Sequence, residues 1–431
     1  MTHKRYENYV DTQEAWLGSY PSHWGRKPLW TLFRRVKRQG FESEELLSVY
    51  RDHGVIPKSS REDNFNKPSD DLGAYQLVEP GDLAVNKMKA WQGSVAISEH
   101  RGIVSPAYHV YTPLHSENHR FLHYLMRCDR YITGYLSISN GIRINQWDLQ
   151  PEYHSRMPVL LPPLDEQIVI ASFLDHETAK IDALIAEQKH LIELLQEKRQ
   201  AVISHAVTKG LNPNAPMKDS GVEWLGQVPE HWTAQKASWL FRAEKGKKAQ
   251  ELTQEYCGAN EGPFPVFSGQ TKDGGVMGAI DSYEFDVGET GAILCTTVGA
   301  KAMSIRLITG QFSLSQNCMV ITSKTAQVTP AFFEYGLQPL FKHERALIPD
   351  HMQPSFRMED FNQFWVQVPP IDEQARIAKY LQEENQASSE LATAISGGIG
   401  LLQERRSALI SAAVTGQIDV RGFVEVEGSE L

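Results

Sequence analysis

Three segments of this chain each occur twice, at a separation of 207 or 208 residues. Residues 16–24 and 224–232 share six of nine positions in the pattern WLG..P.HW, and residues 161–167 and 368–374 share five of seven around PP.DEQ. Residues 194–208 and 401–415 share 11 of 15 positions. Two unrelated segments of that length would share about one. The common separation therefore indicates an internal duplication.

The duplicated unit is too long for a solenoid repeat, whose period is ~20–50 residues. The whole chain of 431 residues is also too long for one hydrophobic core, which stops growing near ~250–300 residues. Between the matched segments lie two regions of nearly equal length that share little sequence: residues 25–160, called the first body, and residues 233–367, called the second body. We therefore expect two copies of one module, with a repeated framework and different bodies.

A long helix is predicted in each copy. Residues 165–209 contain no glycine or proline, and Pro162-Pro163 precede them as at a helix start. Apolar residues recur there at spacings of three and four, as in a coiled coil, and ~44 residues make a helix of about 66 Å. Because the pattern returns 207 residues later, each helix supplies the partner that the other needs. Gly397-Gly398 should weaken or kink the second helix, at up to ~1 kcal/mol per glycine. The predicted seam contains Leu174, Ile181, Ile185, Ile192, Leu195, Val202, Leu381, Ile395, Ile399, Leu402 and Leu409.

Both bodies have the pattern of mixed structure with many short strands. We expect strands at residues 95–97, 108–111, 292–295, 304–308 and 318–321, and helices at residues 42–50, 118–128 and 330–344. The predicted fold class is α+β: two α/β domains separated by two long antiparallel coiled-coil helices, with a pseudo-twofold internal duplication. The expected divisions are a domain at 1–160, a helical spacer at 161–219, a domain at 220–367, and a second spacer with a tail at 368–431. Antiparallel helices would place the two bodies at opposite ends of a rod.

Composition excludes several classes of protein. The 41% hydrophobic and 22% charged content is that of a globular protein. No stretch approaches ~18 consecutive apolar residues, and the first nine residues are polar and mixed in charge, so we expect a cytoplasmic protein. The four cysteines form no CxxC pair and the histidines no HExxH motif, so we expect reduced thiols and no metal.

The formal net charge of -10 argues, for the chain as a whole, against nucleic acid as a partner, because phosphate binding requires lysine and arginine. The distribution is less simple. Residues 1–160 hold 20 basic and 18 acidic residues, while the rest of the chain is acidic. Arg35 and Lys37 belong to a basic run in the first body, and Lys247 and Lys248 to a smaller one in the second.

Catalytic motifs are missing from the sequence. It contains no GxxxxGK[ST] loop, no GxGxxG after a strand and no GxSxG elbow. Asn212-Pro213 is followed by asparagine, so the Asn-Pro-Pro-aromatic motif of adenine methyltransferases is also absent. The carboxylates of Asp165-Glu166 and Asp372-Glu373 stand at predicted helix starts, where we expect them to cap the first turn. We therefore predict that the chain is not an enzyme by itself.

The duplicated motifs WLG..P.HW, [LV]PP[LI]DEQ and LLQE[KR]R.A.IS.AVT resemble those of the specificity (S) subunit of type I restriction-modification systems. The resemblance covers the whole chain. It implies that each body is a target recognition domain that reads one half of a bipartite, asymmetric double-stranded DNA sequence. It also implies that the helices set the spacing and dock two methyltransferase (M) subunits, to which two restriction/translocase (R) subunits add. S-adenosylmethionine, ATP and magnesium would be bound by those partners, and no cofactor by this chain.

Candidate DNA contacts are polar or basic residues in turns beside the expected strands, since base edges are read by a few such side chains. In the first body the predicted base readers are Lys87, Lys89, Gln92, Ser105 and Arg143, with Arg35 and Lys37 on phosphates. In the second body they are Gln270, Lys272, Thr297, Lys301, Gln316, Asn317 and Arg357, with Lys247 and Lys248 on phosphates. Trp91 and Tyr108 are expected in the core rather than as stacking platforms.

Two other functions remain open at this point. In one, the chain is a protein-protein scaffold with two divergent binding domains on a coiled-coil strut, which the net charge of -10 supports. In the other, it is a self-sufficient restriction-methylation enzyme, which the missing motifs disfavour.

Overall fold

The computed structural model describes residues 4–51, 53–61, 69, 71–143, 146–222, 225–269, 272–349 and 351–423. The chain divides into two compact units. The first unit comprises Met1–Lys189 and Ser396–Leu431, and the second unit comprises His190–Ile395. Each unit therefore contains one body and part of each long helix.

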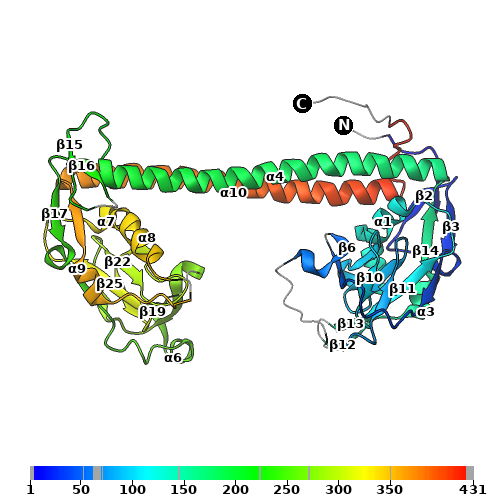
Figure 1. Cartoon of the computed structure of the whole chain (residues 1–431), viewed down its shortest axis with the longest axis horizontal. Helices are drawn as coiled ribbons and strands as arrows, with labels where there is room; N and C mark the ends of the chain where they lie inside the picture. Colours follow the sequence, from blue (N-terminus) through cyan, green and yellow to red (C-terminus); the bar gives the residue numbers. More distant parts are fainter. Residues whose placement is uncertain are drawn as a thin grey trace. The chain divides into compact units, whose positions relative to one another are not determined.

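The two long helices predicted from the sequence are confirmed. Helix α4 spans Leu164–Lys209 and α10 spans Ile371–Val414. In the first unit Ile170 and Leu174 of α4 share a core with Ile410 and Val414 of α10, so the start of one helix packs against the end of the other. Figure 1 shows the two helices side by side within each unit. The helices are therefore antiparallel within the unit.

The same arrangement is present in the second unit, where Ile203 and Val207 of α4 share a core with Ile377 and Leu381 of α10. Polar contacts join the helices as well. Arg199 Nε donates to Asn385 Oδ1 at 2.6 Å in the second unit. In the first unit Arg406 contacts Asp182 with two nitrogens, at 2.9 and 3.1 Å.

All the predicted seam positions are buried or half-buried. Leu174, Ile181, Ile185, Leu381 and Ile395 are buried, and Ile192, Leu195, Val202, Ile399, Leu402 and Leu409 are half-buried. Helix α10 continues through Gly397-Gly398. A kink or a lower helix stability at the two glycines stays a prediction.

The first body begins and ends on a strand pair that adjoins the framework. Its strands are β3 (Gly25–Pro28), β4 (Phe33–Val36), β5 (Leu47–Tyr50), β6 (Gly54–Pro57), β7 (Gln76–Val78), β8 (Leu83–Asn86), β9 (Val95–Ile97), β10 (Gly102–Val104), β11 (Tyr108–Pro113), β12 (Ser139–Arg143), β13 (Gln146–Leu149) and β14 (Pro158–Leu161). Its helices are α1 (His119–Arg127), α2 (Asp129–Ser137) and α3 (Pro151–Arg156), with 3-10 turns η1 (Leu29–Thr31), η2 (Lys58–Ser60) and η3 (Ala90–Gln92). Before it, β1 (Tyr9–Asp11) pairs with β2 (Ser19–Pro21).

The second body is built in the same order. Its strands are β17 (Thr233–Lys236), β18 (Phe241–Glu244), β19 (Glu261–Phe267), β20 (Val276–Ile280), β21 (Phe285–Asp286), β22 (Ala292–Thr296), β23 (Ile305–Ile308), β24 (Gln311–Leu314), β25 (Cys318–Ser323) and β26 (Trp365–Val368). Its helices are α5 (Ala237–Leu240), α6 (Gln254–Ala259), α7 (Pro330–Gly336), α8 (Gln338–Ala346) and α9 (Met358–Gln363), with the 3-10 turn η4 (Lys272–Gly275). Before it, β15 (Met217–Asp219) pairs with β16 (Gln227–Pro229).

Each body contains a central four-stranded sheet of the same strand order, although the two sequences differ. The first has the strand order β4-β11-β8-β9 and the second β18-β25-β22-β23, and every neighbouring pair is antiparallel. The pair β3-β14 corresponds to β17-β26. Two helices follow the last central strand in both bodies, α1 and α2 in one and α7 and α8 in the other. The duplication therefore includes the bodies.

The cores explain why these elements pack as they do. Alternate residues of β8 and β9, such as Leu83 and Val95, face helices α1 and α2, while Ala84 and Ala96 face a second cluster with strands β5 and β6. The second body likewise places Ile293 toward helices α7 and α8 and Leu294 toward the opposite cluster. Because side chains of a strand alternate, each sheet has apolar residues on both faces and is covered on both.

The bodies differ in what covers the second face of the sheet. In the first body that layer consists of the pairs β5-β6 and β7-β10, and the hairpin β12-β13 follows α2. In the second body a four-stranded sheet of order β20-β19-β24-β21 forms it, with β19 and β24 parallel. The variable parts of the module are therefore the outer layer and the loops that it carries.

Most of the secondary structure expected in the bodies is present. The strands at residues 95–97, 108–111, 292–295, 304–308 and 318–321 are confirmed to within one or two residues, as is the helix at 118–128; the helix at 330–344 is divided into α7 and α8. The helix expected at residues 42–50 is wrong, because Leu47–Tyr50 is strand β5. Leu47 and Val49 point into the core and pair across Gly54–Pro57, and this packing overrides the helix propensity of the glutamates before them.

Among the described residues, no helix combines the length and apolar character that crossing a bilayer requires.

Candidate nucleic-acid interface

A polar groove of about 1050 Å³ opens on the outer layer of the first body. Strand β5, turn η2, the segment from β8 to η3, and the turn before β11 form its walls. It brings together three of the predicted base readers, Lys89, Gln92 and Ser105. Lys89 and Gln92 are exposed and Ser105 is half-buried, so all three side chains can meet a ligand in the groove.

Basic and aromatic side chains share this groove. Arg51, Lys58 and Arg61 line it in addition to Lys89, and Asp129 is the acidic residue of its lining. The Arg61 guanidinium lies 5.0 Å from the centroid of the Tyr50 ring. Trp91 and Tyr108, expected in the core, are half-buried and line the groove. The surface therefore combines the positive charge that attracts phosphates with flat rings on which bases can stack.

The opposite face of the same sheet holds two other predicted residues. Arg35 of β4 pairs with Tyr111, and Lys87 lies two residues after Val85, which pairs with His109. Because side chains alternate along strands, Arg35 and Lys87 share a face with His109. Burial, together with the charges of Arg35 and Lys87, lowers the pKa of His109 to about 4. The sequence-predicted set is therefore divided between two faces of the sheet.

The second body has a smaller pocket at the equivalent place. It measures about 290 Å³ and is lined by Ser315, Gln316 and Asn317 before β25 and by Val298 after β22. These are the counterparts of the turns before β11 and after β8 that line the groove of the first body. Gln316 and Asn317 were predicted as base readers, and both are exposed. Gln250 and Thr253 add polar groups, and none of the described residues that line this pocket is charged.

The remaining predicted residues of the second body lie outside this pocket. Lys247 and Lys248 are exposed, and their backbone amides donate to Glu284 Oε1. Thr297 is fully buried, its backbone bonded to Asn317 and Phe356, so its hydroxyl lies beneath the surface. Lys301 is exposed.

Arg357, also exposed, precedes helix α9, and its backbone amide donates to Asp360 Oδ2 at 2.9 Å. Lys37 is exposed after β4. Arg143 lies in β12 and Lys272 in η4, but their side chains are outside what the structure describes, and Gln270 is outside the described residues altogether. The DNA role of every member of the set stays a prediction.

The repeated motifs meet around one carboxylate in each unit. Glu166, which is buried, accepts hydrogen bonds from Trp24 Nε1 at 3.0 Å and from Tyr6 at 2.5 Å, and its other oxygen lies 2.8 Å from His23 Nε2. Asp165 and Glu166 stand in the first turn of α4, as expected, and Glu166 has a further role that the sequence interpretation missed, because the motif P.HW, distant in sequence, supplies donors to it. Capping of the helix by Asp165 stays a prediction. The signal in the sequence was the joint recurrence of HW and DEQ.

The second unit repeats this contact. Glu373 Oε2 lies 2.7 Å from His231 Nε2 and accepts from Trp232 Nε1 at 3.2 Å. The glutamine that follows is also used twice. Gln167 Oε1 accepts from the Asn118 amide at 2.9 Å, and Gln374 Oε1 accepts from the Thr329 amide at 2.9 Å. Asn118 and Thr329 are the N-caps of α1 and α7. The DEQ motif therefore holds α1 against α4 in the first unit and α7 against α10 in the second.

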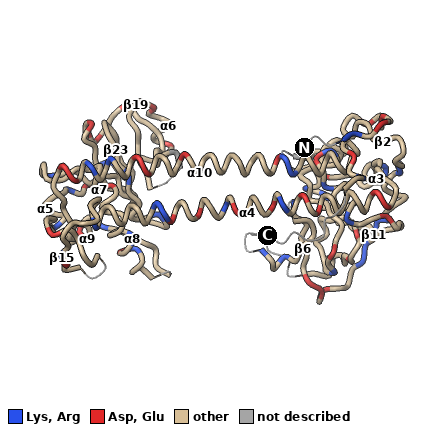
Figure 2. Tube along the Cα trace, turned by 90° about the horizontal axis from the view of Figure 1, so that it is seen from above, with Lys and Arg blue, Asp and Glu red and all other residues tan. Residues whose placement is uncertain are grey.

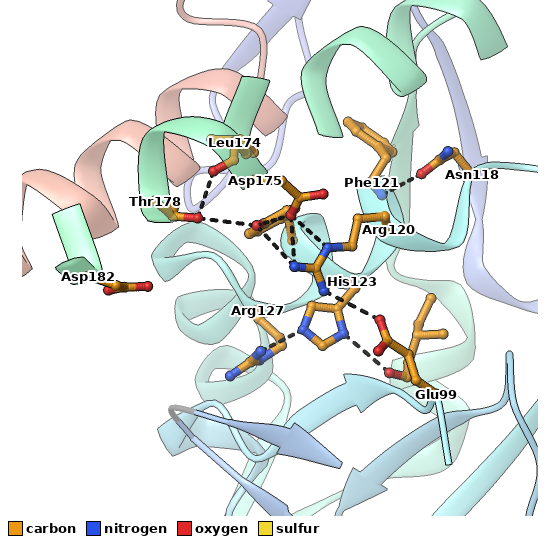
Figure 3. A network of polar contacts seen from close by, with 12 residues as sticks. Glu99, Asn118, Arg120, Phe121, His123, Arg127, Leu174, Asp175, Thr178 and Asp182 are labelled. Atoms are coloured by element: carbon orange, nitrogen blue, oxygen red, sulfur yellow. Dashed lines mark hydrogen bonds and ion pairs between the residues drawn. The ribbon is translucent and has the colours of Figure 1, made fainter. Parts of the chain in front are cut away.

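The first body has an additional attachment to α4 (Figure 3). Arg120 of α1 lies between Asp175 of α4, at 2.7 Å, and Glu99, at 3.4 Å. Tyr124 donates to Asp175 Oδ1 at 2.6 Å. His123 Nδ1 lies 3.2 Å from the Ile97 carbonyl, and Arg127 lies 2.6 Å from its Nε2. Burial and the charge of Arg127 lower the pKa of His123 to about 3, so the ring is neutral and donates to Ile97.

Charge is mixed on the molecule (Figure 2), where lysine, arginine, aspartate and glutamate occur on both long helices and on both bodies. The basic groove of the first body is therefore a local feature.

The chain is similar to known proteins of one kind. Residues 229–396 match the family model of the type I restriction modification DNA specificity domain. The putative type I specificity subunit S.MpnORF507P of Mycoplasma pneumoniae is 27% identical over 148 residues, which are 34% of this chain and 38% of that protein. The type I restriction enzyme EcoKI specificity subunit of Escherichia coli (strain K12) is 21% identical over 236 residues, 50% of this chain and 47% of that protein. The matched part of the chain thus spans less than half of these relatives.

Solved structures share the fold. The HsdS subunit from Thermoanaerobacter tengcongensis superposes with a TM-score of 0.51 at 15% identity, covering 93% of this chain and 98% of that one. A chain in a structure concerned with complex assembly and conformational transition of the type I R-M system superposes with a TM-score of 0.64 at 16% identity, covering 93% and 99%. At these identities the likeness establishes the fold, which agrees with the resemblance seen in the repeated motifs.

Proposed function

We propose that this chain, whose residues 229–396 belong to the type I restriction modification DNA specificity domain family, is the DNA sequence-specificity subunit of a type I restriction-modification complex. In this proposal each body reads one half of a bipartite, asymmetric double-stranded DNA target. The chain acts in the cytoplasm and does no catalysis of its own.

One observation carries the proposal. Each body has a central sheet of the same strand order, and in each the turn after one central strand (β8 or β22) and the turn before its neighbour (β11 or β25) line a pocket. The lining differs, with basic and aromatic residues such as Lys89 and Trp91 in one and neutral side chains such as Asn317 in the other. A common scaffold with different polar linings suits the reading of two different base sequences.

The framework supports a second part of the proposal. Helices α4 and α10 have 46 and 44 residues, and the same antiparallel pairing occurs in both units. Two equivalent surfaces suit two copies of one partner. We assign each of these surfaces to one methyltransferase subunit. The length of the helices sets the distance between the two half-sites. Two restriction/translocase subunits complete the complex, and S-adenosylmethionine, ATP and magnesium are bound by the partners.

An exchange of bodies tests the proposal. The first body, residues 25–160, is replaced by that of a relative, and the variant is expressed in cells with the cognate methyltransferase subunit. Sequencing of modified bases should reveal a split methylated motif in which one half changes and the other is kept. A motif that changes in both halves or in neither would contradict independent reading.

A matched insertion tests the spacing role. Seven residues inserted near Gln188 and seven near Ile395 keep the heptad phase and add ~10 Å to each helix. At ~3.4 Å per base pair, the unspecified gap between the half-sites should grow by up to about three base pairs while the half-sites stay the same. An unchanged gap in a folded, active variant would remove the spacing role.

A protein-protein scaffold is the alternative that the net charge of -10 favours. The same cells distinguish it, because a scaffold would leave the DNA unmethylated. Methylation without any partner subunit would instead indicate a self-sufficient enzyme.

A further inference from the structure

An apolar groove lies on the framework helices of the second unit. It has a volume of about 660 Å³ and is lined by Ala201 and Val202 of α4, Leu211 and Pro213 beyond the end of α4, and Tyr380 of α10. Leu211 is 43% exposed and Tyr380 36% exposed. The groove is therefore open to solvent, at a place where the chain presents large apolar side chains.

Because the chain is duplicated, the first unit has a surface equivalent to this groove. At the offset of 207 residues, Tyr380 corresponds to Phe173 of α4 and Val202 to Leu409 of α10. In the first unit the ring of Phe423, from the chain beyond α10, packs edge-on against Phe173 with a centroid distance of 5.3 Å and an interplanar angle of 77°. Phe423 also lies 5.6 Å from His176.

The tail covers the first unit's groove. Phe173 is only 6% exposed, and Val420, which precedes Phe423, is 4% exposed. Leu409 and Phe423 both pack on the same core. One surface of the framework thus occurs twice, closed by an aromatic side chain of the tail in the first unit and open in the second.

We propose that the open groove of the second unit receives an aromatic side chain from an acidic segment of the methyltransferase subunit. The inference rests on the proposed function and names the contact by which the partner docks. An aromatic ring is indicated because Phe423 fills the equivalent groove against Phe173. An acidic segment is indicated because Lys198 and His205 line the open groove and no lining residue is acidic.

The two docking surfaces are then unequal. A methyltransferase subunit at the second unit finds an open groove, whereas a subunit at the first unit meets a groove already closed by Phe423 and the residues before it. The methyltransferase subunit at the second unit therefore binds more tightly than the one at the first unit, although both use the repeated framework.

Filling the groove tests this docking site. Ala201→Trp places an indole in the open groove, and Ala201 is exposed on α4, so the substitution leaves the helix seam intact. The matched control is Ala408→Trp, at the corresponding exposed position of α10 in the first unit, where Phe423 packs against Phe173, the counterpart of Tyr380. Binding of the purified cognate methyltransferase subunit to the full-length chain is measured by titration calorimetry, and the number of bound copies by native mass spectrometry.

The tighter of the two binding steps should weaken by roughly 30-fold in Ala201→Trp, as for loss of an interface hot spot. Ala408→Trp should change either step by no more than about twofold. Circular dichroism and thermal unfolding verify that both variants are folded. Leu211→Ala, beyond the helix end, is the second variant and should also weaken the tighter step.

Removal of the tail's ring tests the inequality. Phe423→Ala opens the first unit's groove and should strengthen the weaker binding step. Equal effects of Ala201→Trp and Ala408→Trp, or unaltered binding in Ala201→Trp and Leu211→Ala, would overturn the docking site and leave the specificity function standing. Failure of the unmodified chain to bind the methyltransferase subunit at all would overturn both.

Discussion

The first and second bodies are built on the same four-stranded sheet and yet present different surfaces. In the first body the outer layer consists of short paired strands, and its groove of about 1050 Å³ is lined by arginine, lysine and aromatic rings. In the second body a mixed sheet covers the same face, and the lining of the corresponding pocket of about 290 Å³, as far as the structure describes it, is uncharged. The apolar interior that must pack is retained, while the loops that meet solvent vary freely.

The carboxylates at which the repeated motifs meet also differ between the two units. Glu166 in the first unit accepts from Tyr6, Trp24 and His23, whereas Glu373 in the second contacts only Trp232 and His231 among the described residues. The Glu166 side chain is 5% exposed and that of Glu373 is 14% exposed. The repeated contact is therefore more fully buried in the first unit, where Tyr6 is added to it.

Removing these two carboxylates should give the largest difference between the units. Glu166→Ala leaves the buried Tyr6 and Trp24 and the exposed His23 without an acceptor and should lower the free energy of unfolding by about 4 kcal/mol. Glu373→Ala, with the buried Trp232 and the exposed His231 as partners, should lower it by about 2 kcal/mol. Chemical denaturation of each variant measures both values. A loss in Glu373→Ala equal to or greater than that in Glu166→Ala would break the comparison.

Acid should destabilise the first unit before the second. Burial lowers the pKa of His154 to about 3, with a smaller contribution from His109, and lowers that of His123 to about 3. Below about pH 6.5 these two histidines bind protons in the unfolded chain but stay neutral in the folded chain. Their stability contribution is therefore complete above pH 6.5 and is lost as pH falls toward 3, by about 1.4 kcal/mol per pH unit for each ring.

Hydrogen exchange measured between pH 7 and 4.5 follows the two units separately. The second unit contains His190, His205, His231, His343 and His351, all exposed or half-buried, whereas His154 of the first unit is buried, so the first unit should lose protection at the higher pH. His154→Gln, which removes the titration but can keep a hydrogen bond to the Tyr111 hydroxyl now 3.1 Å from the ring, should shift the first unit's loss to lower pH. Loss of both units together, unaffected by this variant, would exclude the histidines as the cause.

The two pockets should respond differently to salt. In the complex with the methyltransferase subunit and a duplex carrying the target, Lys89→Gln should weaken binding. Because the substitution removes a cation from the groove, it should also reduce the slope of log K against log salt, by up to about 0.9. Gln316→Ala should relax the base preference of the second half-site with the slope unchanged. Fluorescence anisotropy over a salt series measures both. A slope that falls with Gln316→Ala and not with Lys89→Gln would reverse the roles.

The smallest effect is expected from the glycines of α10. Gly397 and Gly398 correspond to His190 and Leu191 of α4, and a Cβ added at either glycine meets no other atom within 4 Å. Gly397→Ala and Gly398→Ala should each raise the free energy of unfolding by up to about 1 kcal/mol. Denaturation with urea tests this, and a destabilisation by either substitution would contradict the expectation.

The sequence by itself determined the duplication, the two long helices, the buried seam positions and the division into a repeated framework and different bodies. These features are periodic or local, so they can be read without knowing the fold. Turn residues beside strands can be recognised locally. The sequence therefore singled out as base readers five residues that the structure places in the two pockets: Lys89, Gln92, Ser105, Gln316 and Asn317.

Only the tertiary structure decided the rest. The common strand order of the bodies was hidden because many different apolar residues can fill alternate positions of one sheet, so a shared topology leaves little identity. The groove around Trp91 and Tyr108, and the contacts of Glu166 with Tyr6 and Trp24, join residues from separate parts of the chain. Such contacts depend on strand register and on which apolar faces are covered, and both are settled by packing over long sequence distances rather than by any local pattern.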